Sequence, residues 1–388
     1  MIKRTLLIAT VVLSQLVCAS VVAQELSPYS ATRVMRANEL AQDDKISEAI
    51  EQLKAIKTSR AYDQAFIARM LGVFYWQAEQ LPKAIEQITI AVDSGLLRDE
   101  QAWHTQKMLA DLLLGEQEYT KALEYYYPLL ENAPEPEMVE QIQLRVTQSH
   151  YQAKQWHETL TAVAALHKLV VPDVASYSLK LGAELHLEQW QGAIATLKKL
   201  VDLEPEKDQW WTQLVGLELR VGDEKSAFNH LTLAKQRNIE LSQQELRLLA
   251  QLYAKHGVPE QAARQIAQLD NAKTDVKLLR EQATYWQQAR EWDRATHVWL
   301  QAAKYEPDYH WNAAQIMLQQ QRYQAALAVL DKVPAREEQV ALAKTRAYYK
   351  LDKLDQAIVQ AKLANNISPS SQAKSWVKYL GQLRRAHG

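Results

Sequence analysis

Ten small side chains recur along the sequence at intervals of 31 to 38 residues, and nine of them are alanines. Each is followed four residues later by an apolar residue, and in eight copies a large apolar or aromatic residue stands three positions before it. A period of this length is typical of proteins that stack one small structural unit many times. We call these ten residues the anchors: Ala49, Ala84, Ala122, Thr159, Ala193, Ala227, Ala262, Ala295, Ala326 and Ala357.

Each period is long enough for a pair of antiparallel helices. A small residue is expected where two helices cross most closely, because only a short side chain lets the backbones approach. Twelve residues before the anchors comes the middle of another helix, as at Gly72 and Ala110. Several units end in a proline twelve residues after the anchor, where no amide donor is needed. The pattern predicts a first and a second helix in every unit.

Prolines and anchor spacing suggest how the array is divided. Pro128 falls inside an expected second helix, so we expect that helix to kink or to end early. The widest anchor spacings flank residues 131–137, where we expect any hinge, and we divide the repeats into 24–135 and 136–370. Residues 371–388 lack an anchor but carry Trp376 and Leu380. This segment is expected to form a capping helix, which repeat arrays need for solubility.

Composition favours helices and excludes several classes of protein. The chain has 10 glycines in 388 residues, whereas sheet-rich proteins and dinucleotide-binding enzymes need glycine at turns and phosphate loops. Lys and Arg number 45 against 46 Asp and Glu, so there is no basic excess to neutralise nucleic-acid phosphates. We therefore expect an all-α protein with no nucleic-acid partner.

The first 23 residues have the features of a signal peptide. Lys3 and Arg4 precede an apolar stretch at 6–17, and small residues at 21 and 23 favour cleavage before Gln24. An uncleaved inner-membrane anchor is the alternative. The only cysteine is Cys18, so the mature chain would have no thiol. No later segment resembles a membrane span, and we expect an exported, periplasmic protein.

The repeats resemble the tetratricopeptide repeat (TPR). The resemblance rests on the Leu-Gly-x2-Tyr motif ending at Tyr75, the related Leu-Ala-x2-Tyr motif ending at Tyr253, and the anchors with their following prolines. It covers nearly all of the chain after residue 24. It implies a right-handed superhelical α-solenoid of about ten helix pairs, whose concave groove is lined by first helices and binds segments of protein partners.

A narrower resemblance comes from several longer segments. Residues 60–76, 91–97 and 248–255, with Trp210-Trp211 and Tyr309-His310-Trp311, are similar to periplasmic repeat proteins of marine gamma-proteobacteria. Those proteins are encoded beside TonB/ExbB/ExbD-type energy-transduction genes. The resemblance implies a cell-envelope partner, and TonB/ExbB/ExbD-type components of iron–siderophore uptake are the candidates.

Catalytic patterns are absent from the sequence. There is no nucleotide-binding glycine loop, and no thiol follows residue 18. His157-Glu158 begins like a zinc-protease helix, but Thr161 stands where the second imidazole ligand is required. The histidines are scattered over different units. We expect no enzyme activity, no metal and no cofactor.

Packing explains five of the 11 tryptophans, which hold core positions of the repeat: Trp156, Trp190, Trp211, Trp292 and Trp299. Trp210 is explained less easily. Trp76 and Trp311 are expected to point from first helices into the groove, where an aromatic residue can anchor a partner peptide. The alternative is that they fill space between neighbouring units.

The same geometry selects polar residues that face the groove. In the C-terminal half Arg247, Arg280 and Arg346 would hold the carboxylates of an acidic peptide by bidentate hydrogen bonds, unless they form an ordinary solvated surface. The candidate binding set is Arg69, Trp76, Lys107, Asp111, Gln148, Tyr151, Arg247, Gln251, Arg280, Trp311, Arg346 and Tyr349.

The sequence bears on three candidate functions. The first is a non-enzymatic periplasmic scaffold that binds an envelope partner, with the TonB connection implied by the resemblance alone. The second is an adaptor in cell-wall or exopolysaccharide assembly and export. The third is an enzyme, which no residue pattern supports.

Overall fold

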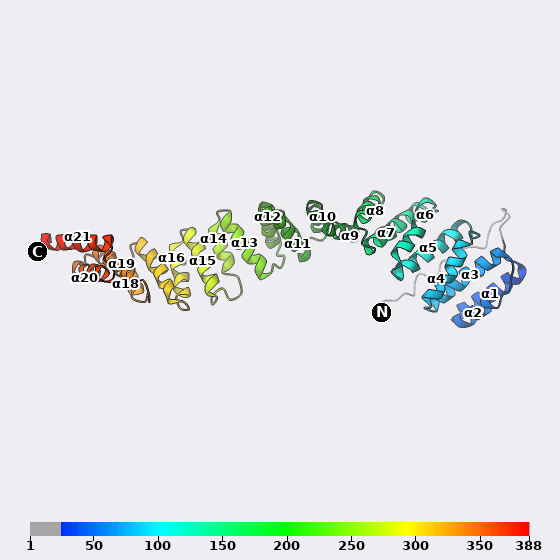
Figure 1. Cartoon of the computed structure of the whole chain (residues 1–388), viewed down its shortest axis with the longest axis horizontal. Coiled ribbons are helices and arrows are strands. Elements are labelled where there is room, and N and C mark those ends of the chain that lie inside the picture. The colour runs from blue at the N-terminus through cyan, green and yellow to red at the C-terminus, as the bar shows by residue number, and fades with distance from the viewer. Residues whose placement is uncertain (1–24, 388) are drawn as a thin grey trace. The chain divides into compact units, whose positions relative to one another are not determined.

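The computed structural model describes residues 25–387, and in that range the regular elements are helices (Figure 1). The first helices of the ten units are α1 (Pro28–Gln42), α3 (Ala61–Gln77), α5 (Asp99–Gly115), α7 (Pro136–Gln152), α9 (Val174–His186), α11 (Asp208–Arg220), α13 (Gln243–Lys255), α15 (Val276–Gln288), α17 (His310–Gln319) and α19 (Glu337–Lys350). The second helices are α2 (Ile46–Lys54), α4 (Leu81–Asp93), α6 (Tyr119–Glu131), α8 (Trp156–Leu169), α10 (Trp190–Leu203), α12 (Glu224–Gln236), α14 (Pro259–Ile266), α16 (Trp292–Ala302), α18 (Tyr323–Leu330) and α20 (Leu354–Ile367). A 3₁₀ turn, η1 (Pro307–Tyr309), precedes α17, and α21 (Ser371–His387) follows the last pair.

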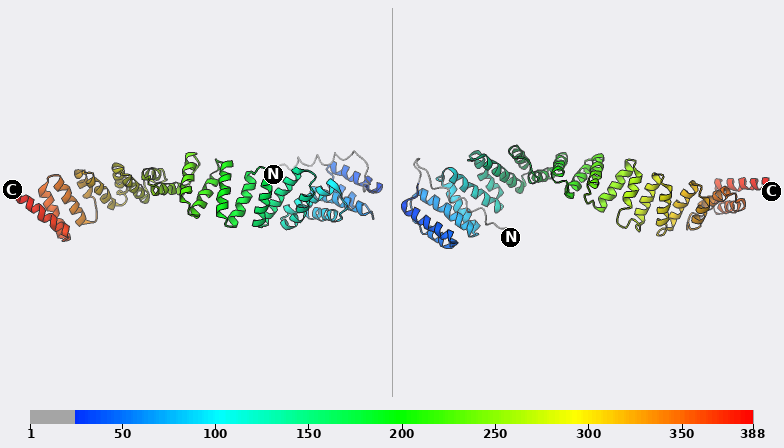
Figure 2. Two further views of the ribbon diagram at one scale, coloured as in Figure 1. Left: turned by 90° about the horizontal axis from the view of Figure 1, so that it is seen from above. Right: turned by 180° about the vertical axis from the view of Figure 1, so that it is seen from behind.

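The predicted fold class is confirmed as an all-α, TPR-like solenoid of helix pairs. Each anchor lies in a second helix, and the described part of the chain contains ten pairs plus the predicted C-terminal helix. Figure 2 shows the helix pairs following one another from two further directions. The right-handed sense of the superhelix stays a prediction.

Burial of the anchors explains the repeat. All ten side chains have 0% of their surface exposed. The residues twelve positions earlier are also buried, and eight of the ten are Gly, Ala or Thr. Gly72 shows the reason in its own pair: a Cβ atom there would lie 2.4 Å from Cγ1 of Ile88, on the second helix of the same pair. A larger side chain at either position would push the two helices apart.

The turn inside each pair has a common backbone conformation. Five residues before every anchor stands a residue with φ between 55° and 79°, in the left-handed region. Only Gly222 and Gly257 are glycines; the others are Asp44, Glu79, Gln117, Lys154, Glu188, Arg290, Gln321 and Asp352. The conformation closes the first helix, as where the amide of Gln80 donates to the carbonyl oxygen of Tyr75 at 2.8 Å.

The chain divides into two compact units, one reaching to Thr196 and one beginning at Leu197, so the boundary falls inside α10. In the first unit the core runs through α1–α3 around Leu53 and through α4–α8 around Tyr126. In the second unit the largest core joins α14 to α19 around Trp299. The division at residue 135 inferred from the sequence stays a prediction.

One core position differs between repeats. Nine residues before the anchor, seven units carry a large apolar or aromatic side chain, as at Trp286 and Met317. The fourth, fifth and sixth units carry His150, Glu184 and Glu218 there, and all three are buried. Each therefore needs polar partners inside the fold. Glu184, for example, accepts a hydrogen bond from the Thr196 hydroxyl at 2.7 Å.

The C-terminal cap and Pro128 test two local predictions. α21 packs on α20, with Leu380 buried against Ala357 and Ala361 and with Trp376 beside them. The predicted capping helix is confirmed. Pro128 lies inside α6, which continues to Glu131, so the early end of this helix was wrong and the kink stays a prediction. The helix continues because a proline removes only its own amide donor and leaves the later residues able to bond.

The predicted signal peptide, residues 1–23, lies outside the described residues. Among residues 25–387, no helix combines the length and apolar character needed to cross a membrane.

Candidate partner-binding surfaces

The first-helix surface of residues 25–196 holds a polar cluster that includes three predicted residues. Lys107 and Asp111 form an ion pair at 2.7 Å, and the guanidinium of Arg145 on α7 lies 3.7 Å from the same carboxylate. Arg145 also donates to Gln148 at 3.1 Å. The Tyr126 hydroxyl donates to Asp111 at 2.6 Å, and burial, together with this carboxylate, raises the pKa of Tyr126.

This cluster joins three predicted residues through two that the sequence did not single out, Arg145 and Tyr126. Tyr126 lies four residues after the anchor Ala122, a position that the repeat pattern assigns to the core. Its hydroxyl reaches from that core to Asp111. The acid is thus surrounded by donors from α5, α6 and α7, which links consecutive helices.

The other predicted residues of this unit make their described contacts with residues outside the cluster. Arg69 donates to the Thr105 hydroxyl at 3.1 Å, and burial lowers its pKa. The Trp76 side chain is 39% exposed. Tyr151 contacts Trp156 edge to face, with the ring centroids 5.4 Å apart. A Cβ atom at Gly182 would stand 2.4 Å from the Tyr151 hydroxyl, so the ring fills the space that this glycine leaves.

In residues 197–388 the three predicted arginines are not equivalent. Arg247 pairs with Glu281 of the next first helix, N to O, at 2.8 Å. Arg280 and Arg346 are exposed, and within the described chain neither forms an ion pair. The Tyr285 hydroxyl also donates to Glu281 at 3.1 Å, and burial followed by the Glu281 charge raises the pKa of Tyr285 to about 12.

The predicted aromatic residues of this unit are largely packed. Trp311 is half-buried against the core of α14–α19, with the Arg336 guanidinium 5.9 Å from its ring centroid. The Tyr349 hydroxyl lies 2.8 Å from that of Tyr379 on the capping helix. Tyr349 is therefore partly occupied by this contact with the cap. Gln251 is exposed.

The five tryptophans assigned to packing are buried or half-buried. Trp211 and Trp299 are 2% and 3% exposed. Trp156 stacks on His186 with the ring centroids 4.1 Å apart. Trp210 is buried as well, and its indole N–H donates to Glu204 at 2.8 Å.

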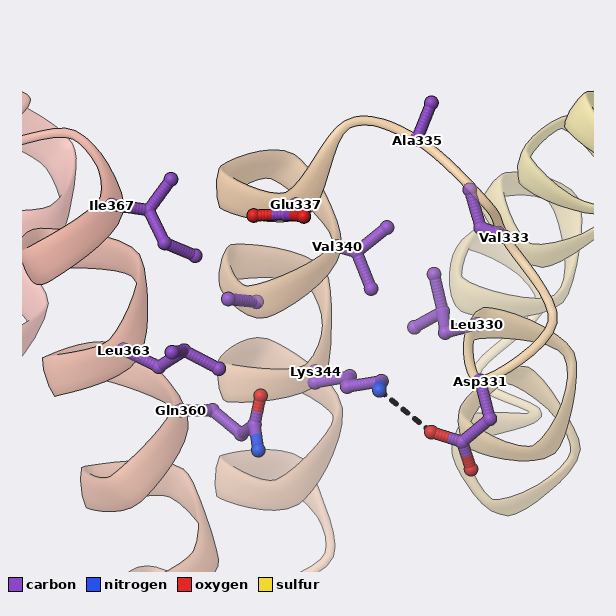
Figure 3. Close-up of a pocket in the computed structure, with 11 residues that line it drawn as sticks. Leu330, Asp331, Val333, Ala335, Glu337, Val340, Lys344, Gln360, Leu363 and Ile367 are labelled. Carbon is purple, nitrogen blue, oxygen red and sulfur yellow. Dashed lines mark ion pairs between the residues drawn. The ribbon is translucent and has the colours of Figure 1, made fainter.

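Two clefts open on the other side of the helix pairs, between successive second helices. One, of about 240 Å³, lies between α18 and α20 over α19 (Figure 3). Leu330, Val333 and Val340 form one wall and Leu363 the other, and Lys344 reaches Asp331 at 2.6 Å. Sequence reasoning missed this surface because it selected the first helices alone.

The second cleft, of about 390 Å³, lies between α10 and α12 over α11. It is lined by Lys198, Val201, Asp202, Pro205, Trp211, Leu214, His230, Leu233 and Arg237, all within residues 197–388. The signal that would have found it is the exposed leucine six residues after the anchor, Leu233, which a packing role does not explain.

The arrangement offers binding surfaces. Within residues 25–387, His, Cys, Asp and Glu side chains do not gather in threes as metal ligands. The described side chains can hold peptide groups by ion pairs, hydrogen bonds and apolar contact.

No protein-family model matches the sequence, and neither does any curated protein. Solved structures do show similarity of fold. A tetratricopeptide repeat protein from Parabacteroides merdae is 14% identical, with 67% of this chain and 99% of that chain covered and a TM-score of 0.38. YrrB, a TPR protein with an unusual peptide-binding site, is 17% identical over 50% and 92%, also at 0.38.

The APC/C hetero-tetramer Cut9–Hcn1 is 14% identical to this chain over 90% of it and 83% of the matched chain, at a TM-score of 0.28. At such scores these similarities establish no shared ligand or partner.

Proposed function

We propose that this chain is a non-enzymatic scaffold of the periplasm that binds a protein partner and serves as an accessory component of a TonB-type energy-transduction system. The array of helix pairs supports the scaffold. The resemblance of the segments at 60–76 and 248–255 to TonB-associated repeat proteins supports the narrower assignment. The apolar N-terminal segment with its small residues before Gln24 supports export.

One observation carries the binding role: the free guanidinium groups on the first-helix surface of residues 197–388. Arg247 is joined to Glu281, but Arg280 and Arg346 have no acidic partner in the described chain. An arginine that makes no internal contact keeps its fork of donors for a carboxylate on another molecule. Half-buried Trp311, on the first helix between theirs, would add apolar contact area.

The test is capture of envelope proteins by the tagged chain from a periplasmic extract, followed by titration of the captured protein. Arg280→Glu combined with Arg346→Glu is expected to weaken binding at low salt by about tenfold, which corresponds to about 1.4 kcal/mol. Raising the salt concentration should shrink that difference, because exposed charges are screened.

A control with the same charge change uses Arg36→Glu and Lys273→Glu, two exposed cations away from these positions. It should bind as the wild type does. Equal weakening by both double variants would show a general charge effect and contradict the assigned surface.

The narrower assignment predicts which proteins are captured. Crosslinking in intact cells is expected to join the chain to a TonB-, ExbB- or ExbD-type component. The N-terminal sequence of the protein recovered from the periplasm should begin at Gln24. Capture of polysaccharide-export proteins instead would contradict the TonB assignment and leave the scaffold role in place.

A further inference from the structure

We propose that the cleft between α10 and α12 is a second docking site, which takes a carboxylate flanked by apolar side chains from a protein partner. The proposal rests on the scaffold function above and adds a surface on the second helices. A volume of about 390 Å³ lies within the roughly 300–1,000 Å³ of ordinary ligand pockets.

The charged residues of the cleft favour a carboxylate as the group that the ligand presents. Arg237 follows α12, lines the cleft and is exposed, and no ion pair of the described chain includes it. Lys198 on α10 lines the opposite side, 3.6 Å from the buried Glu218. The one acid in the lining, Asp202, lies 3.7 Å from Lys199 outside the cleft. Arg237 is therefore the charge left without a counterpart.

The buried carboxylate of Glu218 determines which ring nitrogen of His230 carries a proton. Glu218 is 1% exposed and lies 2.8 Å from Nδ1 of His230. When Glu218 is ionised, Nδ1 must carry the proton of this hydrogen bond. Nε2 then has no hydrogen-bond partner among the described residues and is the ring nitrogen left for a ligand.

The apolar part of the cleft favours leucine-like neighbours for the carboxylate. Trp211 and Leu214 lie beneath it, with Val201 from α10 at one side. Leu233 is 39% exposed although its side chain is apolar. Covering exposed apolar surface is favourable by about 25 cal/mol per Å². A ligand of charge alone would leave this surface in contact with water.

The cleft is separate from the first-helix surface. Thr212 of α11 corresponds in the repeat to Arg247 of α13, since each stands fifteen residues before its anchor. Trp211, beneath the cleft, is the residue next to Thr212. Successive residues of a helix point about 100° apart. A partner can therefore contact one surface without contacting the other.

The cleft near the C-terminus occupies the same place in its own repeat and shows what makes the first one specific. His230, Leu233 and Arg237 correspond there to Gln360, Leu363 and Ile367. The single cation of that lining, Lys344, is already paired with Asp331. The exposed leucine is common to both clefts, whereas the free cation is found in one.

The experiment uses the whole chain with 5-fluorotryptophan in place of its 11 tryptophans and follows Trp211 by ¹⁹F NMR, with the resonance assigned by Trp211→Phe. The probes are capped heptapeptides with one glutamate between two leucines, and the same peptide with glutamine or lysine in place of the glutamate. The glutamate peptide should shift the Trp211 resonance. The glutamine and lysine peptides should bind at least about fivefold more weakly.

Arg237→Glu should raise the Kd of the glutamate peptide about tenfold. This residue is exposed and unpaired, so the variant should keep the wild-type Tm. Lys273→Glu, at an exposed cation that neither lines the cleft nor belongs to the candidate binding set, is the matched control and should leave this Kd unchanged. A Trp211 resonance that does not move with millimolar peptide, or a Kd that Arg237→Glu does not change, would overturn the proposal.

The two proposals fail in different ways. If the peptide binds as expected and no envelope protein is captured, the scaffold function is contradicted and the cleft remains a binding site. If an envelope protein is captured and the peptide does not bind, the cleft is contradicted alone.

Discussion

The two surfaces of the helix pairs in residues 197–388 use their charged side chains differently. On the first-helix surface Arg247 is bound to Glu281 of the next repeat, and Tyr349 contacts Tyr379 of the cap. On the second-helix surface Arg237 has no acidic partner in the described chain, and the nearby Leu233 is exposed. Both surfaces hold ion pairs between repeats as well as unpaired cations. At the cleft the unpaired cation stands beside an exposed leucine.

The comparison shows that position in the repeat does not decide whether a side chain is available to a partner. Arg247 and Arg280 stand at the same position of consecutive first helices. Only Arg247 meets an acid on the following helix, because Glu281 happens to stand opposite it. A binding surface in a repeat protein is therefore defined by what the neighbouring repeats leave unpaired.

The largest expected effect removes the support of both surfaces. Ala295→Trp places an indole where the anchor is fully buried, beside Trp299, and overpacking should cost at least about 1–3 kcal/mol. Ala328→Trp adds the same group at an exposed position of α18 and should leave the Tm nearly unchanged. Equal losses of Tm would contradict the assigned repeat register.

Deleting residues 371–388 should disturb the first-helix surface next to the cap and leave the cleft between α10 and α12 unchanged. The deletion uncovers Ala357 and Ala361 and removes the Tyr379 contact of Tyr349, so α19 and α20 should exchange their amide hydrogens faster. The cleft at Lys198–Arg237 should keep its exchange rates. Uniform acceleration along the whole chain would be inconsistent with stability that is local to each repeat.

Smaller effects are expected from breaking ion pairs, one group beside the cleft and one pair on the first-helix surface. Glu218→Ala leaves Lys198 and His230 without their buried carboxylate and should lower the free energy of unfolding by about 1–3 kcal/mol. Glu218→Gln, which keeps the volume, should cost less. Arg247→Ala breaks a pair that is largely exposed on the arginine side and should cost at most about 1 kcal/mol. Denaturant titration measures all three, and a larger loss for Arg247→Ala would reverse the comparison.

The last expected effect is a pH dependence of the first-helix surface, confined to alkaline pH. The pKa of Tyr285 is raised to about 12 in the folded chain, above the usual 10 of the unfolded one. The unfolded chain therefore loses this proton first, and stability should fall as the pH rises from about 10 to about 12. Tyr285→Phe should reduce that fall in thermal unfolding measured across the range. An unchanged slope would show that Tyr285 titrates normally.

The repeat, the helix pairs and the cap were predictable because they follow from local spacing. An anchor such as Ala84 is recognisable from residues three and four positions away, and the helices that it joins are neighbours in the sequence. The early end of the helix at Pro128 was wrong, since one missing amide did not outweigh the packing of Tyr126 and Leu129.

The candidate surface was less predictable because its contacts join residues about 34 positions apart. Nothing next to Arg247 in the sequence indicates that Glu281 will meet it, and Arg145 was not connected with Asp111 for the same reason. The clefts depend on how far the side chains of successive second helices extend. Besides Leu233, Glu218 was a signal that the sequence offered, because it stands where seven other repeats place a large apolar or aromatic residue.

The left-handed turns have a consequence for how the thermal tolerance of this chain can be adjusted. Eight of the ten turn residues have a side chain, at a cost of roughly 1–2 kcal/mol each in this conformation. Glycine would remove that cost. It would also destabilise the fold by roughly 0.5–1 kcal/mol, because it gives the unfolded chain more conformational entropy. Each replacement, such as Glu79→Gly, is thus a small stabilising step, and distant steps add. None of the eight lines a cleft or belongs to the candidate binding set, so heat resistance and recognition can vary independently.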